Sequence, residues 1–259
     1  MTTRRIMATS GGFVAGDRYT APQPGESIRR MLALTGKDRP RLTFVMTASG
    51  DDRSYLTRSY AAFRGWSVDL QHLELFPMPN ADPAELLGTS DAVWVGGGSV
   101  ANLLACWKLH GVDAAMRDAW ERGVVLGGVS AGSICWHTGG TTDSFGPELR
   151  AVTNGLGLLP YSNGVHYDSE EQRRPLVHSL VAAGTLGTTY CTDDHVGILY
   201  EGTEPVEVIT DRGPPPDGPM AYRVERQAGS GSGTSGTRGT RGSGTSEPVS
   251  ETPLPPGPL

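Results

Sequence analysis

The sequence predicts an α/β fold: a doubly wound, mainly parallel sheet with helices on both faces. The first half of the chain supports this, because short apolar runs alternate with segments of helical spacing. The runs are continuous rather than alternating with polar residues, which is typical of strands covered on both faces. Three runs end in glycine-rich segments, Ser10-Gly11-Gly12, Gly96-Gly97-Gly98 and 128–132. In a parallel sheet these ends gather at one rim, where ligands bind.

The elements follow in order along the first half. The apolar runs predict strands at 6–9, 42–47, 68–75, 92–95 and 124–129. Helical spacing predicts helices at 27–35, 51–64, 83–87, 100–109 and 112–122. Gly36 and Gly65 follow two of these helices directly and are typical helix stops.

The pattern changes after Gly139. Residues 141–160 are expected to be loop-like, 173–181 a helix, and 187–200, 205–210 and 220–225 strands. Residues 1–227 are therefore expected to form one α/β domain. Residues 228–259 are rich in Gly, Ser, Thr and Pro and have almost no large apolar residue, so a disordered tail is expected there.

Composition excludes several classes of function. The formal net charge is −6 and no basic cluster lies outside the tail, which argues against nucleic-acid binding. No apolar run is long enough for a membrane span or a signal peptide. Cys106, Cys135 and Cys191 show no metal-site or disulfide spacing and fit buried thiols of a reducing compartment. We expect a cytoplasmic monomer or homodimer without a metal or cofactor.

Gly128-Val129-Ser130-Ala131-Gly132 is the strongest chemical signal. An apolar strand ends there and a plausible helix follows, as in a nucleophile elbow. The tight turn exposes the serine hydroxyl, and the small residues at positions 128 and 132 avoid a collision. Ser130 is therefore the candidate nucleophile.

A serine nucleophile needs a base, and histidine is the usual one near neutral pH. Of the six histidines, His166 stands out because Gly164 lets the backbone turn and Tyr167-Asp168 follow it. An acid must orient the imidazole, and spacing does not choose among the candidates. These are Asp143, Glu148, Asp168, Glu170, Asp193 and Asp194.

Four motifs in one order resemble the peptidase E family, which includes aspartyl dipeptidase and is related to cyanophycinase. They are Gly96-Gly97-Gly98, Ser130 with Ala131-Gly132-Ser133, Thr141-Thr142-Asp143-Ser144, and His166 followed by Glu171-Gln172-Arg173. The resemblance implies a sandwich similar to class I glutamine amidotransferases and a Ser-His-acid triad without metal.

Carried over by position, the resemblance implies Ser130 as nucleophile and His166 as base. The triad acid falls within Thr192-Asp193-Asp194-His195, with Asp193 as first choice and Asp194 as second. The N–H groups of Ala131 and Gly98 would form the oxyanion hole. Asp143 matches an acidic residue near the family's site, where it would shape the pocket or contact the substrate amine.

Glu170 departs from the family pattern, since aspartyl dipeptidases carry an arginine there that suits an aspartyl carboxylate. In this chain, Arg173 or Arg174 would have to take the place of that arginine. A carboxylate at this place favours a neutral or basic side chain, or binds the free amine of a peptide. It also fits the first turn of a helix, where the dipole stabilises negative charge.

The sequence therefore predicts a serine exopeptidase that hydrolyses short peptides, as a dipeptidase does, through an acyl-enzyme. Two alternatives stay open. One is a hydrolase on the same scaffold that acts on a β-linked aspartyl bond or a non-peptide amide. The other is an inactive member that binds a small molecule and keeps the elbow for packing.

Overall fold

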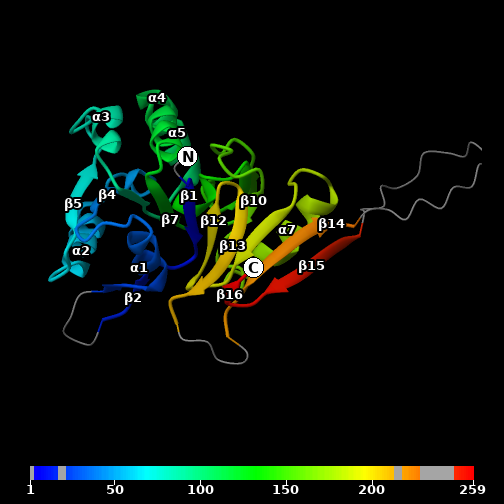
Figure 1. Ribbon diagram of the computed structural model, residues 1–259. Coiled ribbons are helices and arrows are strands. Elements are labelled where there is room, and N and C mark those ends of the chain that lie inside the picture. Colours follow the sequence, from blue (N-terminus) through cyan, green and yellow to red (C-terminus); the bar gives the residue numbers. More distant parts are fainter. Residues whose placement is uncertain (1–2, 17–21, 213–217, 228–247) are drawn as a thin grey trace, which may run out of the picture.

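The computed structural model describes residues 3–16, 22–212, 218–227 and 248–259 (Figure 1). Its helices are α1 (Glu26–Ala33), η1 (Thr47–Ser49), α2 (Arg53–Ala62), α3 (Pro83–Gly88), α4 (Val100–His110), α5 (Val112–Glu121), α6 (Ala131–Ile134) and α7 (Arg173–Ala182). Its strands are β1 (Arg5–Thr9), β2 (Phe13–Val14), β3 (Gln23–Pro24), β4 (Arg41–Val45), β5 (Asp69–Leu73), β6 (Ala92–Val95), β7 (Val125–Val129), β8 (Gly139–Thr142), β9 (Arg150–Val152), β10 (Ser162–Gly164), β11 (Thr189–Thr192), β12 (Val196–Glu201), β13 (Glu204–Thr210), β14 (Ala221–Arg226), β15 (Val249–Leu254) and β16 (Gly257–Pro258).

The larger sheet has the strand order β16-β13-β12-β1-β7-β6-β4-β5. The last five strands in that order run parallel, and β12 joins β1 antiparallel. The carboxyl ends of β1, β7 and β6 therefore meet at one rim, as the glycine-rich ends predicted. The α/β fold class is confirmed.

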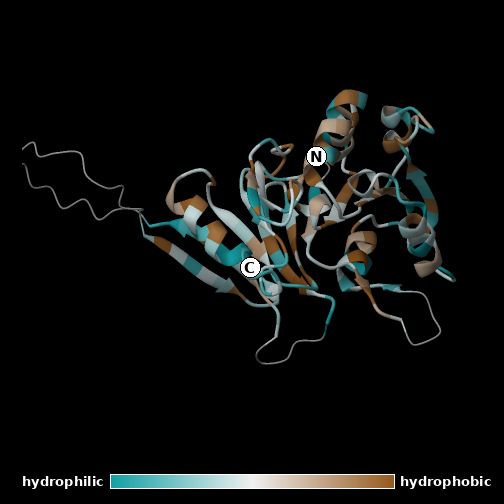
Figure 2. Cartoon of the chain, turned by 180° about the vertical axis from the view of Figure 1, so that it is seen from behind, coloured by the Kyte–Doolittle hydropathy of each residue, from teal (hydrophilic) through white to brown (hydrophobic). Residues whose placement is uncertain are grey.

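Both faces of this sheet carry an apolar core, which explains the continuous apolar runs. Successive residues of one strand point to opposite faces. Leu126 packs with α4 and α5, whereas its neighbour Val125 packs with α1 and α2. Figure 2 shows hydrophobic residues concentrated along these central strands.

A second sheet, with the order β15-β14-β11-β10-β8-β9, was not foreseen. Part of the region expected to be loop-like forms β9 and the end of β8. Strands β10 and β11 run parallel and side by side. The segments after Gly164 and Thr192, which carry the candidate base and acids, therefore leave the sheet together.

The predicted disordered tail is wrong for residues 248–259. Strand β15 pairs with β14, and β16 pairs with β13 (Figure 1). Residues 228–247 lie outside the described part of the chain. Main-chain pairing needs few large apolar side chains, so the composition of this segment did not reveal it.

Glu251 on β15 anchors the strand to α7 and to the segment after β10. Its carboxylate accepts hydrogen bonds from the Tyr167 hydroxyl at 2.7 Å and Arg174 Nη1 at 2.8 Å. His178 Nε2 lies 2.8 Å from the same carboxylate. We expect Glu251→Gln to lower the free energy of unfolding by about 1–2 kcal/mol, because charge-assisted hydrogen bonds are lost. Urea unfolding checks this against Glu121→Gln at an exposed position; equal stability of the two variants contradicts it.

His137 follows α6 and is fully buried, and burial lowers its pKa to about 4. The unfolded chain takes up a proton as the pH falls through 6.5, but the folded chain does so only near pH 4. The stability contributed by the neutral ring is thus present above pH 6.5 and is lost as the pH falls toward 4. We expect the free energy of unfolding to drop by about 2 kcal/mol between pH 7 and 5 on this account.

Urea unfolding at both pH values measures that drop. His137→Gln should flatten it, whereas His110→Gln at the end of α4 should keep it. An unchanged pH dependence in His137→Gln contradicts the assignment.

No helix in the described part of the chain is both long and apolar enough to cross a membrane.

Candidate active site

Ser130 sits at the tip of a strained turn between β7 and α6. Its backbone has φ 56° and ψ −114°, a conformation that costs energy for any residue other than glycine. The backbone N–H of Ser130 donates to the Thr9 carbonyl at 3.0 Å, which fastens the turn to the end of β1. This is the geometry of a nucleophile elbow.

The glycines around the turn are required by close backbone contacts. A Cβ on Gly132 would collide with the Val95 carbonyl oxygen at the end of β6, and one on Gly128 with the carbonyl of Gly132. Gly98 has φ 137° and faces the Ala48 carbonyl in the same way. The strand ends can therefore pack against the elbow only with glycine at these places.

His166 follows β10 and also has a positive φ, 53°. Its Nδ1 lies 2.5 Å from Asp194 Oδ1, and both side chains are partly exposed. Burial raises the pKa of Asp194, but hydrogen bonds from His166 and Ser169 outweigh it and hold the pKa below its usual range. An ionised carboxylate at Nδ1 fixes the tautomer that leaves Nε2 free to act as a base.

Asp193, the first choice for the acid, is not brought to His166. Its Oδ2 accepts hydrogen bonds from Met220 N at 3.0 Å and from the Tyr222 hydroxyl at 3.4 Å. Burial raises its pKa. Adjacent residues at a strand end point to opposite sides, so Asp193 faces β14 while Asp194 faces the imidazole.

Ser10, at the end of β1, joins the segments that carry these side chains. Its hydroxyl accepts from His166 N at 3.0 Å and donates to the Thr192 carbonyl at 3.0 Å. Its carbonyl accepts from His195 N. Since Thr9 holds the backbone of Ser130, two consecutive residues fix the backbones of the candidate nucleophile and base.

Within the described residues, no hydrogen bond joins Ser130 Oγ to the ring of His166. In substrate-free enzymes, catalytic hydrogen bonds are often long and tighten only when substrate binds. Ser130 Oγ and His166 Nε2 also make no hydrogen bond to any other part of the described chain. Both atoms are thus free to engage a substrate.

The N–H groups of Gly98 and Ala131 likewise donate to no group in the described part of the chain. The neighbouring N–H of Gly97 donates to the Tyr55 hydroxyl, whose pKa is raised by burial. A Cβ on Gly97 would lie 3.3 Å from Ser130 Cβ, so this strand end passes close to the serine. Gly98 and Ala131 thus supply two unpaired donors beside the elbow.

The three residues suggested for substrate contact differ in their placement. Asp143 and Glu170 border a recess of about 470 Å³, which also includes Glu171 and which we call the acidic recess. Glu170 lies one turn from His166, with its N–H bonded to the His166 carbonyl. Arg173 is only 2% exposed, and its guanidinium binds Thr141 and Glu170. Arg173 therefore holds β8 and Glu170 in place and does not face a substrate.

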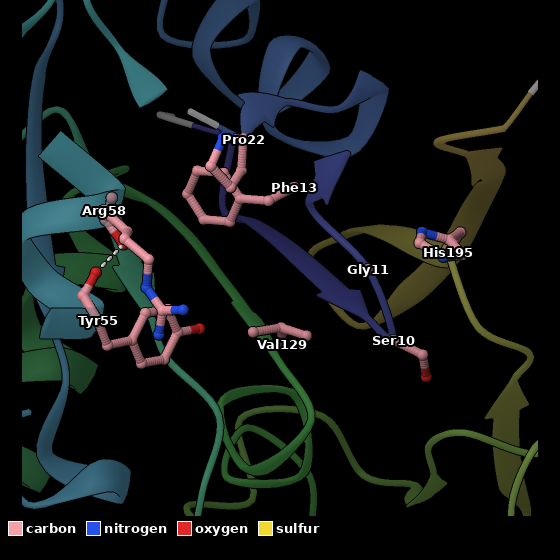
Figure 3. Close-up of a pocket in the computed structure, with 9 residues that line it drawn as sticks. Ser10, Gly11, Phe13, Pro22, Tyr55, Arg58, Val129 and His195 are labelled. Carbon is pink, nitrogen blue, oxygen red and sulfur yellow. Dashed lines mark hydrogen bonds between the residues drawn. The ribbon is translucent and has the colours of Figure 1, made fainter. Parts of the chain in front are cut away.

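A pocket of about 360 Å³ lies beside the elbow on the α1 and α2 side of the sheet. Phe13, Pro22, Tyr55 and Val129 give it a mostly apolar lining, and we call it the apolar pocket. Figure 3 shows Tyr55 and Arg58 facing Phe13 and Val129 across it.

Sequence reasoning missed Ser10, Tyr55 and Arg58 as residues of this region. The glycines after Ser10 did mark the rim, but its hydroxyl contacts are made with residues more than 150 positions away. His195 ends the segment in which the triad acid was expected, and its sequence context indicated no role for it. Its positive φ of 68°, like that of His166, is a backbone signal that no composition rule detects.

Comparisons with known proteins identify the family and the fold of this chain. The sequence model of peptidase family S51 matches residues 6–208. An uncharacterized peptidase of Bacillus subtilis (strain 168), YgaJ, is 39% identical over 85% of this chain and 92% of its own length. Peptidase E of Streptomyces coelicolor is 29% identical over 49% of this chain and 51% of its own.

Two solved structures share the fold. A peptidase E structure from Listeria monocytogenes EGD-e has a TM-score of 0.58 at 18% identity and covers 82% of this chain and 100% of its own. A peptidase from an acI-B1 actinobacterium has a TM-score of 0.60 at 14% identity, with coverage of 85% and 90%. Two findings, the match to the family model and the similarity to the Bacillus subtilis protein, show that this chain is a peptidase and belongs to peptidase family S51.

Proposed function

We propose that this chain is a serine exopeptidase that hydrolyses short peptides, as a dipeptidase does, with Ser130, His166 and Asp194 as its triad. The observation that carries the proposal is the placement of Ser130 and His166. Both have strained backbones, and both are fastened to the consecutive residues Thr9 and Ser10. Such strain persists where the surrounding structure enforces it, which is typical of active sites.

In the acylation step, Ser130 Oγ attacks the scissile carbonyl carbon while His166 Nε2 takes its proton. Asp194 stabilises the imidazolium through Nδ1. The carbonyl oxygen gains negative charge, and the N–H groups of Gly98 and Ala131 donate hydrogen bonds that stabilise this charge. The imidazolium then gives its proton to the leaving amine, and the acyl group remains on Ser130 as an ester.

In the deacylation step, His166 takes a proton from a water molecule that attacks the ester carbonyl. The tetrahedral intermediate collapses, the ester bond to Ser130 breaks, and the proton returns to Ser130 Oγ. The acid product leaves and the free serine is restored. The same imidazole and the same oxyanion donors serve both steps.

The acidic recess supports a preference for peptides with a free amino terminus. Asp143 and Glu171 would attract an ammonium group, whereas the charge of Glu170, held one turn from the base, is paired with Arg173. The same charges disfavour an aspartate as the first residue. We therefore expect peptides whose first residue is neutral or basic to be hydrolysed more efficiently than peptides that begin with aspartate.

The test is labelling with a fluorophosphonate probe, which reacts with activated serines, followed by a panel of dipeptides that differ in the first residue. We expect the folded protein to be labelled at Ser130, located by peptide mapping, and to release amino acids from members of the panel. Heat-unfolded protein is the control and should stay unlabelled. A folded protein that is neither labelled nor active on any dipeptide would refute the proposal.

A further inference from the structure

The apolar pocket has no role in the chemistry derived above, yet it lies directly beside the reacting groups. Val129 in its wall precedes Ser130, and Tyr55 packs over Gly96 and accepts a hydrogen bond from Gly97. Gly97 in turn approaches Ser130 closely. A substrate bound at Ser130 therefore has this pocket within reach of one of its two residues.

One end of the pocket adjoins the segments that carry the base and the proposed triad acid, and Tyr55 and Arg58 lie at the other end (Figure 3). Ser10 in its wall holds the backbone N–H of His166, and His195 in its wall follows Asp194. In acyl transfer the imidazole passes its proton to the leaving amine, so the leaving residue must extend toward the imidazole. The pocket is thus placed for the residue on the leaving side of the scissile bond.

The side chains that line the pocket indicate which class of ligand it can bind. Phe13, Pro22, Tyr55 and Val129 suit an apolar side chain, and a volume of about 360 Å³ has room for a large one. Arg58 adds a positive charge at the same pocket and forms no salt bridge with any described residue. The pKa of nearby Asp52 is lowered, mainly by hydrogen bonds from Ser54 and Tyr55 and also by the charge of Arg58.

His195 also lines the pocket. Its Nδ1 is buried from solvent, so a ligand in the pocket does not reach this atom. The pocket therefore offers an apolar wall with the guanidinium of Arg58 as its charged group.

We propose that the apolar pocket binds the C-terminal residue of a dipeptide, with an apolar side chain against Phe13 and Tyr55 and the free α-carboxylate on Arg58. A guanidinium binds a carboxylate through two parallel hydrogen bonds, and this contact exists only when the leaving residue is the last one. Arg58 thereby restricts the enzyme to dipeptides. This inference rests on the proposed function and names its substrate class.

The experiment compares dipeptides ending in leucine or phenylalanine with the same peptides as C-terminal amides. The first residue is the one that the panel above shows to be best. We expect the wild type to hydrolyse the free acid at least about tenfold more efficiently in kcat/KM than the amide, mainly through KM. Arg58→Gln should remove this difference. Arg53→Gln, on the same helix but outside the pocket, should keep it.

A second measurement does not depend on hydrolysis. Calorimetry should detect binding of free phenylalanine to the wild type and to Arg53→Gln, and weaker binding to Arg58→Gln by about tenfold or more. Phenylalanine amide should bind all three proteins equally weakly.

Three results would overturn the inference: equal hydrolysis of acid and amide by the wild type, an Arg58→Gln variant that behaves like the wild type, or sensitivity to Arg58 that follows the first residue instead of the last. Failure of the proposed function looks different. There, the folded wild type cleaves no dipeptide at all, and calorimetry alone decides whether the pocket takes a carboxylate.

Discussion

Ser130→Ala should lower kcat/KM for dipeptide hydrolysis by at least about a thousandfold while the protein stays folded. The reason is that no other group at the elbow can form the acyl-enzyme, and loss of a triad nucleophile typically costs several orders of magnitude. Stability should change little, because the Ser130 hydroxyl makes no hydrogen bond in the described part of the chain, and serine and alanine bear the same strain at this positive φ. Steady-state kinetics and urea unfolding measure the two quantities.

Ser133→Ala is the matched control, three residues further along in α6. The Ser133 hydroxyl donates to Asn163 Oδ1 at 2.9 Å and is completely buried. Its loss should lower the free energy of unfolding by about 1–3 kcal/mol and leave the chemistry intact. A Ser130→Ala protein with more than a tenth of wild-type activity would mean that the nucleophile lies elsewhere.

Asp194→Asn should reduce kcat by about a hundredfold to ten-thousandfold at neutral pH. An amide donates its N–H groups and carries no charge, so it favours the wrong imidazole tautomer and cannot stabilise the imidazolium. The loss should appear in kcat more than in KM, because the 2.5 Å contact with His166 acts on the base and not on the substrate.

Asp193→Asn separates the two neighbouring carboxylates. An asparagine can still accept the hydrogen bonds from Met220 N and Tyr222. It also removes the charge of the Asp193 carboxylate, whose pKa is raised by burial. This variant should keep activity within about threefold of the wild type and unfold no more easily at pH 7. Equal losses in the two variants would argue that neither carboxylate acts on His166 alone.

The parallel sheet was predictable because its physics is local. Continuous apolar runs and glycine helix stops act within a few residues, and they placed the elbow and the rim. The second sheet was not predictable in this way. Strands such as β9 and β10 have only three residues each, and β15 is held by main-chain pairing and Glu251.

The residues of the candidate site differ in the same way: local sequence determines some of them, and tertiary contacts determine the others. Ser130, Gly128 and Gly132 form a local turn, so the sequence alone was enough to identify them. Close backbone contacts at this turn explain why glycine is required at positions 128 and 132. The choice between Asp193 and Asp194 depends on which side of β11 each carboxylate faces, and this is set by the partner strand β14. The apolar pocket joins residues from β2, α2, β7 and the segment before β12, which no spacing rule connects.

The contacts of Ser10 also determine when the enzyme can act during its own synthesis. The hydroxyl and main chain of this residue bind His166, Thr192 and His195, which lie more than 150 positions later in the chain and are therefore synthesised after it. A nascent chain that already displays the serine elbow therefore lacks a positioned base. With the triad proposed above, hydrolytic competence arises only after translation has passed the segment that follows β11.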